Sequence, residues 1–285
     1  MIRLAIPNKG RIVPDIIRLL EKIGLEISEN GRKLYANTNN PNIQVLYTRA
    51  ADIPFYVEAG AADLGVTGED MISESGVQVK KLLKLNFGGC KIVVASLSSS
   101  KIKSPKDYLG GLRVATNLVN TTIKYFNARG VDPNIIRLSG AIELAPNLGI
   151  ADVIVDQVST GTTLVANNLS IVDTISESSI CLIANAKSLR EKEKEVDELK
   201  LSMEGVVIAE GKRYIMANVV SDDDLKRVIE VMPCMESPTV LELSREGEYA
   251  VHSVIDSIDL IPTIRKLKEA GAKDILVMNV SRVVE

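Results

Sequence analysis

The sequence predicts two α/β lobes followed by a small βαββαβ domain, on three observations. The first half alternates short β-branched runs with runs of helical period, a pattern typical of βαβ units and a largely parallel sheet. A charged segment, 186–200, then interrupts this pattern. The remaining strands and helices follow in the order βαββαβ, which is typical of a ferredoxin-like domain.

The first lobe is predicted from alternating strand and helix signals. Its expected elements are a strand at 3–7, a helix from Pro14 to Gly24, a strand at 43–47, a short helix at 52–60 and a strand at 63–67. The second lobe is expected to hold strands at 92–96, 112–116, 135–138 and 153–155, with helices at 121–129 and 143–148. We place the first lobe at 1–89, completed by about 176–204, and the second at 90–175. A cleft between them is the natural ligand site.

A third domain is predicted at 205–285. Strands are expected at 213–219, 239–243, 249–255 and 275–278, with one helix opened by the cap Ser221 and another ending before Gly271. The charged segment before it keeps a sparse apolar stripe of Leu189, Val196 and Leu199, which favours a connecting helix. A small appended domain of this kind more often binds or regulates than catalyses.

Composition excludes several classes of function. The formal net charge is −3, with Lys and Arg spread along the chain, which argues against a nucleic-acid partner. The chain contains no apolar run near the roughly 20 residues of a membrane span, so we expect a cytoplasmic protein. Three distant cysteines and the single His252 argue against disulfides and against a zinc site, and we predict no metal held by protein ligands alone.

The stretch "ADVIVDQVSTGTTL", 151–164, predicts an anion site. It follows the order strand, loop and helix start, and its loop offers four hydroxyls and a glycine where backbone N–H groups are free. A phosphate suits this place because hydrogen bonds and the helix dipole both favour an anion. Ser159 and Thr160 acting only as helix caps is the alternative.

Further polar residues follow the ends of predicted strands, where open α/β sheets bind ligands. They are the cations Lys9 and Arg11 around Gly10, the cation Arg49, and the acids Glu143, Asp152 and Asp156. Taken singly, each cation could equally be a solvated surface residue. Each acid could equally cap a helix or interact with a helix dipole. Together, the cations and the hydroxyl loop would bind a ligand that carries phosphates at both ends.

Four segments give the chain a family resemblance: "LAIPNKGR", "LYTRAADIPFYVEAGAADLGVTGEDMI", "GAIELAPNLGIADVIVDQVSTGTTL" and "MESPTVLEL". Together they resemble ATP phosphoribosyltransferases of the long type, over essentially the whole chain. The resemblance implies two periplasmic-binding-protein-like (type II) lobes and the first step of histidine biosynthesis. In that step N1 of ATP displaces pyrophosphate from phosphoribosyl pyrophosphate.

The resemblance also implies roles for the residues already singled out. The hydroxyl loop would hold the 5′-phosphate of the sugar through Ser159, Thr160, Gly161, Thr162 and Thr163. Because Val155 replaces the first of two adjacent acids, ribose recognition would fall on Asp156 with Glu143 or Asp152. Lys9, Arg11 and Arg49 would face pyrophosphate or ATP phosphates, with Mg²⁺ bridging the phosphate oxygens, and Asp70 is the candidate for ATP contact.

Regulation is a further implication of the resemblance. We expect histidine to inhibit the enzyme from the third domain, through Glu236, Ser237, Thr239 and Ala272, in a homo-oligomer that is a dimer or a hexamer. The alternative function is a cytoplasmic binding module for an amino acid or a phosphorylated solute on the same two lobes. Such a module explains the lobes, and an amino-acid binder leaves the phosphate-type loop unexplained.

Overall fold

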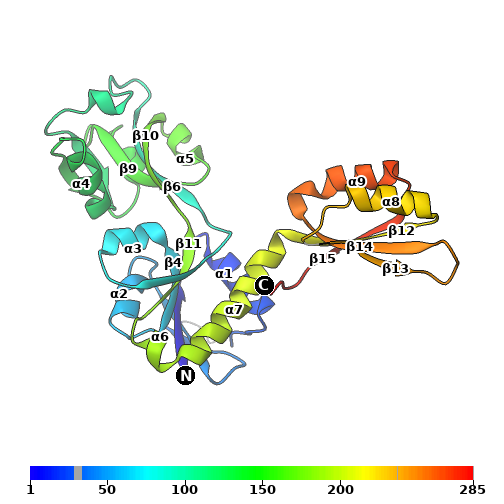
Figure 1. Ribbon diagram of the computed structural model, residues 1–285. Helices are drawn as coiled ribbons and strands as arrows, with labels where there is room; N and C mark the ends of the chain where they lie inside the picture. Colours follow the sequence, from blue (N-terminus) through cyan, green and yellow to red (C-terminus); the bar gives the residue numbers. More distant parts are fainter. Residues whose placement is uncertain (29–33, 236, 285) are drawn as a thin grey trace. The chain divides into compact units, whose positions relative to one another are not determined.

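The computed structural model describes residues 1–28, 34–235 and 237–284. The chain divides into two compact units, Met1–Glu198 and Leu199–Glu285, each with its own core. The first unit contains two α/β lobes, and the second contains a single sheet with helices α8 and α9 and most of α7 (Figure 1).

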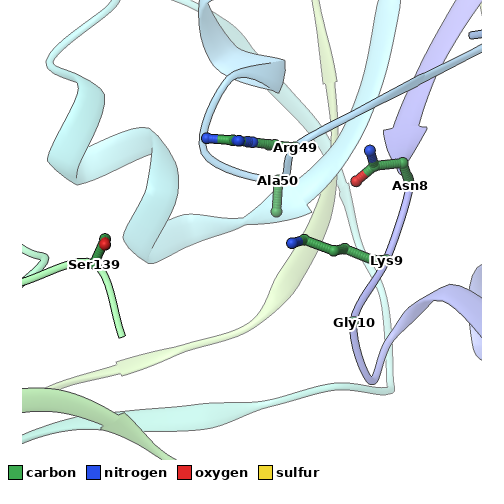
Figure 2. A pocket seen from close by; sticks show the side chains of 6 residues that line it. All are labelled: Asn8, Lys9, Gly10, Arg49, Ala50 and Ser139. Carbon is green, nitrogen blue, oxygen red and sulfur yellow. The ribbon is translucent and has the colours of Figure 1, made fainter. Parts of the chain in front are cut away.

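Lobe I is built on a six-stranded sheet with the order β2-β3-β1-β4-β11-β5. Its strands are β1 (Ile2–Pro7), β2 (Tyr35–Asn37), β3 (Ile43–Thr48), β4 (Leu64–Gly68), β5 (Lys80–Lys84) and β11 (Ile180–Ala184), and its helices are α1 (Val13–Lys22), α2 (Ile53–Glu58) and α3 (Glu69–Ser75). β1 runs parallel to β3 and β4. The turns after β1 and β3 therefore bring Lys9 and Arg49 to one edge of the sheet (Figure 2).

Lobe II has a five-stranded sheet with the order β10-β6-β9-β7-β8. Its strands are β6 (Cys90–Leu97), β7 (Arg113–Thr116), β8 (Asn134–Arg137), β9 (Val153–Val158) and β10 (Leu169–Ser178), with helices α4 (Val119–Asn127) and α5 (Thr162–Ala166) and 3₁₀ turns at 105–107 and 142–144. Phe126 is fully buried and meets the rings of Tyr108 and Tyr125 edge-on. The parallel strands β7, β8 and β9 place three loops at one edge.

The chain crosses between the lobes twice, from β5 to β6 and from β10 to β11. β11 runs antiparallel to β4 and β5, so the last strand of lobe I comes from far along the sequence. This arrangement of two lobes joined by two crossovers confirms the predicted periplasmic-binding-protein-like fold.

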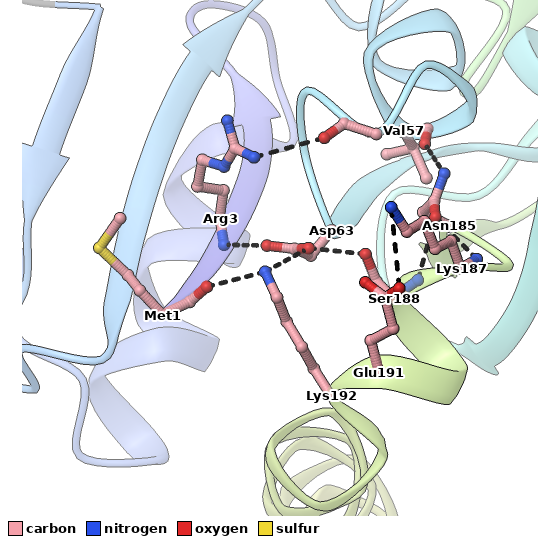
Figure 3. Close-up of polar contacts among 10 residues, drawn as sticks. Met1, Arg3, Val57, Asp63, Asn185, Lys187, Ser188, Glu191 and Lys192 are labelled. Carbon is pink, nitrogen blue, oxygen red and sulfur yellow. Dashed lines mark hydrogen bonds and ion pairs between the residues drawn. The ribbon is translucent and has the colours of Figure 1, made fainter.

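A buried carboxylate fixes the return of the chain to lobe I (Figure 3). Asp63 is 2% exposed and accepts hydrogen bonds from the Ser188 hydroxyl at 2.6 Å, the Lys192 ammonium at 2.7 Å and the Arg3 backbone N–H at 2.8 Å. Burial opposes the charge, but these hydrogen bonds outweigh it and hold the pKa of Asp63 below its usual value. Arg3 lies in β1, whereas Ser188 and Lys192 lie on or next to α6 (Ser188–Glu191), just before α7 (Glu193–Glu210).

The second unit has the predicted ferredoxin-like order. Its elements are β12 (Lys212–Val219), α8 (Asp222–Val231), β13 (Thr239–Glu242), β14 (Tyr249–Asp256), a 3₁₀ turn (Ser257–Asp259), α9 (Leu260–Glu269) and β15 (Lys273–Asn279). The sheet order β13-β14-β12-β15 is antiparallel throughout. Ser221 accepts a hydrogen bond from the Asp224 backbone N–H at 3.2 Å, which confirms it as the cap of α8.

Two of the predicted helices differ clearly from the structure, and β2, β5, β10, β11 and α3 were not predicted. The helix expected at 143–148 is a 3₁₀ turn, Ile142–Leu144, because the chain reaches Pro146 before an α-helical turn can propagate. The connecting helix extends from Glu193 to Glu210, well beyond the charged segment, since Met203 and Val206 continue its buried stripe. Among the described residues, no helix is long and apolar enough to cross a membrane.

Candidate active site

The cations of lobe I line a cavity of about 580 Å³. Asn8, Lys9, Gly10, Arg49 and Ala50 come from lobe I, and Ser139 comes from the loop after β8 in lobe II. Figure 2 shows Lys9 and Arg49 extending toward the side on which Ser139 lies. Two long cationic side chains from neighbouring strand ends thus enter one cavity that both lobes form.

Arg11 lies in the same loop and is exposed. Its positive charge lowers the pKa of the Cys90 thiol at the start of β6. Burial has the larger effect and raises that pKa above its usual value. Gly10 has φ +114°, a conformation that favours glycine. The loop can therefore turn sharply between Lys9 and Arg11.

The hydroxyl loop of lobe II lines a second cavity of about 220 Å³. Its wall includes Ser159, Thr160, Gly161 and Thr163, and the Thr162 hydroxyl lies 3.1 Å from that of Thr160. Gly161 has φ +77° and occupies the N-cap position of α5. A glycine there lets backbone N–H groups approach an anion closely.

Two acids lie on the wall of the same cavity. Glu143 lies within the 3₁₀ turn Ile142–Leu144, and Asp156 directly follows the buried residues of β9. Burial and the neighbouring charge of Glu143 raise the pKa of Asp156, although the Gln157 backbone N–H donates to it at 2.8 Å. Two carboxylates on the wall of this cavity are suited to accept hydrogen bonds from sugar hydroxyls.

Asp152 lies at the opposite end of β9 from this pair. Its carboxylate pairs with the guanidinium of Arg113, at 2.7 Å to Nη2 and 3.2 Å to Nε, and accepts the Arg113 backbone N–H. The structure therefore separates Asp152 from the hydroxyl loop beside which the sequence placed it. Glu143 and Asp156 remain as the acids that face the cavity.

Asp70 lies in the first turn of α3, and neighbouring residues contact both of its carboxylate oxygens. Ser178 donates to Oδ1 at 2.7 Å and Gln157 donates to Oδ2 at 2.5 Å. A role for Asp70 in ATP contact stays a prediction.

Ser139 is a wall residue that the sequence analysis did not select. It follows β8 and precedes Ala141, which has φ +50°, a rare conformation for a residue other than glycine. Ser139 lines the larger cavity and Glu143 the smaller one, so a single tight segment borders both. The signal available in the sequence was its place after a strand, as for Lys9 and Arg49.

The residues selected for histidine binding do not meet within one copy of the chain. Thr239 begins β13 and Ala272 directly precedes β15, and these strands form opposite edges of the sheet, about 14 Å apart. Ser237 is exposed near Thr239, whereas Ala272 is 8% exposed in the core. Glu236 lies outside the described residues.

Within the described part of the chain, no three His, Cys, Asp or Glu side chains are grouped so that they could hold a metal ion. Glu143 and Asp156 offer two carboxylates at most on the wall of the smaller cavity. Such a wall suits a Mg²⁺ ion whose remaining ligands are substrate phosphates and water.

Comparisons with known proteins agree with one another. The sequence profile of the ATP phosphoribosyltransferase family matches residues 49–205, and that of the HisG C-terminal domain matches 209–282. An ATP phosphoribosyltransferase of Methanococcoides burtonii is 46% identical over 288 residues, and one of Methanosarcina mazei is 45% identical over 291, with full coverage of both chains in each case.

Solved structures include a similar protein as well. A chain from the ATP phosphoribosyl transferase (HisG:HisZ) complex of Thermotoga maritima matches with a TM-score of 0.64 and 30% identity. The match covers 71% of this chain and 96% of that one.

Proposed function

Because the chain belongs to the ATP phosphoribosyltransferase family, we propose that it joins N1 of ATP to C1 of the ribose of phosphoribosyl pyrophosphate. The products are phosphoribosyl-ATP and pyrophosphate, and the step begins histidine biosynthesis. We expect it to take place in the cytoplasm.

The proposal rests mainly on the chemistry of the two cavities. The hydroxyl loop offers a rigid set of donors for the 5′-phosphate, while Lys9 and Arg49 offer mobile charges for pyrophosphate or ATP phosphates. The displacement builds positive charge on the ribose and negative charge on the leaving group. Cations at the larger cavity and carboxylates at the smaller one suit this separation of charge.

The residues Glu143 and Asp156 would hold the ribose between these two groups. Their carboxylates, which lie on the wall of the smaller cavity, would accept hydrogen bonds from the sugar hydroxyls and stabilise the positive charge that develops on the ribose. Mg²⁺, when bound, would neutralise the pyrophosphate oxygens and make them a better leaving group.

A direct assay tests the reaction. The full chain is incubated with ATP, phosphoribosyl pyrophosphate and Mg²⁺, and mass spectrometry follows the masses of phosphoribosyl-ATP and of the two substrates. We expect product only when all three are present. Binding of an amino acid or a phosphorylated solute without turnover under any condition would instead favour the solute-binding function.

Histidine regulation is the second part of the proposal. Since Thr239 and Ala272 lie on opposite edges of one sheet, a ligand that touches both must lie between two copies of the domain. Histidine bound there would inhibit by favouring one arrangement of a homo-oligomer, a dimer or a hexamer, and about 1–3 kcal/mol of coupling is enough.

Two point variants test this regulatory role. Ser237→Ala and Thr239→Val together should raise the histidine concentration for half-inhibition at least tenfold and leave turnover without histidine unchanged. If histidine inhibits this variant and the parent chain equally, histidine does not bind at the domain face around Thr239.

A further inference from the structure

Helix α3 of lobe I carries two acids that both reach lobe II. Asp70 and Glu74 lie four residues apart, so they occupy the same face of the helix. We call this face, formed by Asp70 and Glu74, the α3 clamp. Each acid makes its own set of contacts across the boundary between the lobes.

Glu74 caps a helix that belongs to the other lobe. Its carboxylate accepts hydrogen bonds from the backbone N–H groups of Asn120 at 2.9 Å and Thr121 at 3.0 Å, and the Asn120 side chain donates to its carbonyl at 2.7 Å. These residues form the first turn of α4, where backbone N–H groups have no partner within the helix. The N-cap position itself is Leu118, whose side chain has no polar atom to offer. Lobe I therefore supplies the cap that α4 needs.

Asp70 makes the second attachment, at the edge of the phosphate site. Its Oδ2 accepts the hydrogen bond from Gln157, which lines the smaller cavity and directly follows Asp156. Its Oδ1 accepts the Ser178 hydroxyl, at the crossover from β10 to β11. A Cβ at Gly68 would overlap Oδ1, so a larger residue there would displace the carboxylate from this position.

Both attachments join lobe I to lobe II, through Asn120 in α4 and through Gln157 in β9. Two-lobed units open and close by rotation about their crossover segments, here those between β5 and β6 and between β10 and β11. Opening would break the contacts of Glu74 with α4 and of Asp70 with Gln157. A closed arrangement keeps both contacts intact.

We propose that the α3 clamp sets the angle between the lobes, and that Glu74 and Gln157 are positioning residues for phosphoribosyl transfer. The kinetic part rests on the proposed function, and the geometric part does not. Gln157 connects the clamp to the phosphate loop, so the clamp fixes that loop relative to Lys9 and Arg49. A misplacement of about 1 Å between reacting groups lowers turnover as much as a hundredfold.

The experiment measures the distance between the lobes in the full chain without substrate. Spin labels are attached to cysteines introduced at Glu21 in α1 and Asn134 in β8 of lobe II, both exposed in the structure. Cys90 and Cys234 are replaced by serine, and Cys181 stays in the core. Pulsed electron resonance then gives the distribution of distances.

Glu74→Ala should broaden this distribution toward longer distances and lower kcat about ten- to hundredfold. Asp107→Ala is the matched control, because Asp107 also accepts two backbone N–H groups, those of Lys103 and Ser104, but within lobe II. The control should change neither the distances nor kcat. An unchanged distribution in folded Glu74→Ala, or an equal change in the control, would overturn the clamp.

A charge swap tests the second attachment. Gln157→Glu alone sets two carboxylates against each other and should broaden the distances, whereas Asp70→Asn with Gln157→Glu restores one donor and one acceptor and should narrow them again. If the double variant does not narrow the distribution of distances, the contact between Asp70 and Gln157 is not part of the clamp. Broadened distances with unchanged kcat would overturn the positioning role while leaving the transferase activity itself intact.

Discussion

The two lobes offer an anionic ligand different chemistry. Lobe I offers the long, exposed side chains of Lys9 and Arg49, whose charged ends can follow a group that moves. Lobe II offers backbone and short hydroxyls around Gly161, whose positions the fold determines. If the proposed function holds, we expect the hydroxyl loop to bind the phosphate that stays on the sugar and the cations of lobe I to bind the leaving group.

The largest expected effect comes from the cations of lobe I. Arg49→Ala should lower kcat by about 10²- to 10³-fold, since one preorganised donor to developing negative charge is worth that much. Arg49→Lys keeps the charge and should recover part of the loss. Steady-state kinetics with a melting curve checks this, and a loss of folding with normal residual activity would assign Arg49 to structure.

A smaller effect is expected from the loop of lobe II, mainly on binding. Gly161→Val and Thr163→Val should each raise the KM for phosphoribosyl pyrophosphate about ten- to hundredfold, because a hydrogen bond to a charged group is worth about 1.5–3 kcal/mol. Titration calorimetry checks the affinity directly. Unchanged affinity in both variants would mean that the loop only caps α5.

The smallest effect is on stability, and it has opposite signs at the two ends of β9. The raised pKa of Asp156 stabilises the fold below about pH 3.9, its ordinary value, and this contribution is lost as the pH rises through the folded pKa. Asp156→Asn should therefore melt higher than the parent at pH 8, and the gain should vanish near pH 3.

Asp152 provides the matched control for this measurement. Its hydrogen bonds to Arg113 lower its pKa, so its contribution is present above the ordinary aspartate value and is lost as the pH falls through the folded pKa. Asp152→Asn should therefore melt lower than the parent at pH 8. The same sign for both variants in thermal melts would contradict the assignment of Asp156 to the site and Asp152 to structure.

Local signals allowed much of the fold to be predicted. Ser221 predicted the start of α8 as its N-cap, and the alternation of apolar and polar residues predicted strands in both units. Both signals depend only on neighbours in the sequence. β10 and β11 were not predicted as strands. Their pairing with β6 and β4 joins residues far apart in the chain, and the surface run of β10 lacks a clean alternation.

The candidate site divides in the same way. Lys9, Arg49 and the hydroxyl loop could be selected because each follows a strand, and that rule depends only on local order. The contacts of Glu74 with Asn120 and of Asp152 with Arg113 could not be inferred, because each joins partners about 40 residues or more apart. An acid near a helix end gives the same local sequence pattern whether it lines a binding site or makes a structural contact.

Gly68 shows how a contact between distant residues limits which substitutions a position accepts. Its φ of −77° suits any residue, so its backbone would not mark it as irreplaceable. Yet even alanine there would displace the Asp70 carboxylate. In a saturation mutagenesis library selected for histidine prototrophy, position 68 should tolerate fewer substitutions than Gly110, which has open space around its Cβ position.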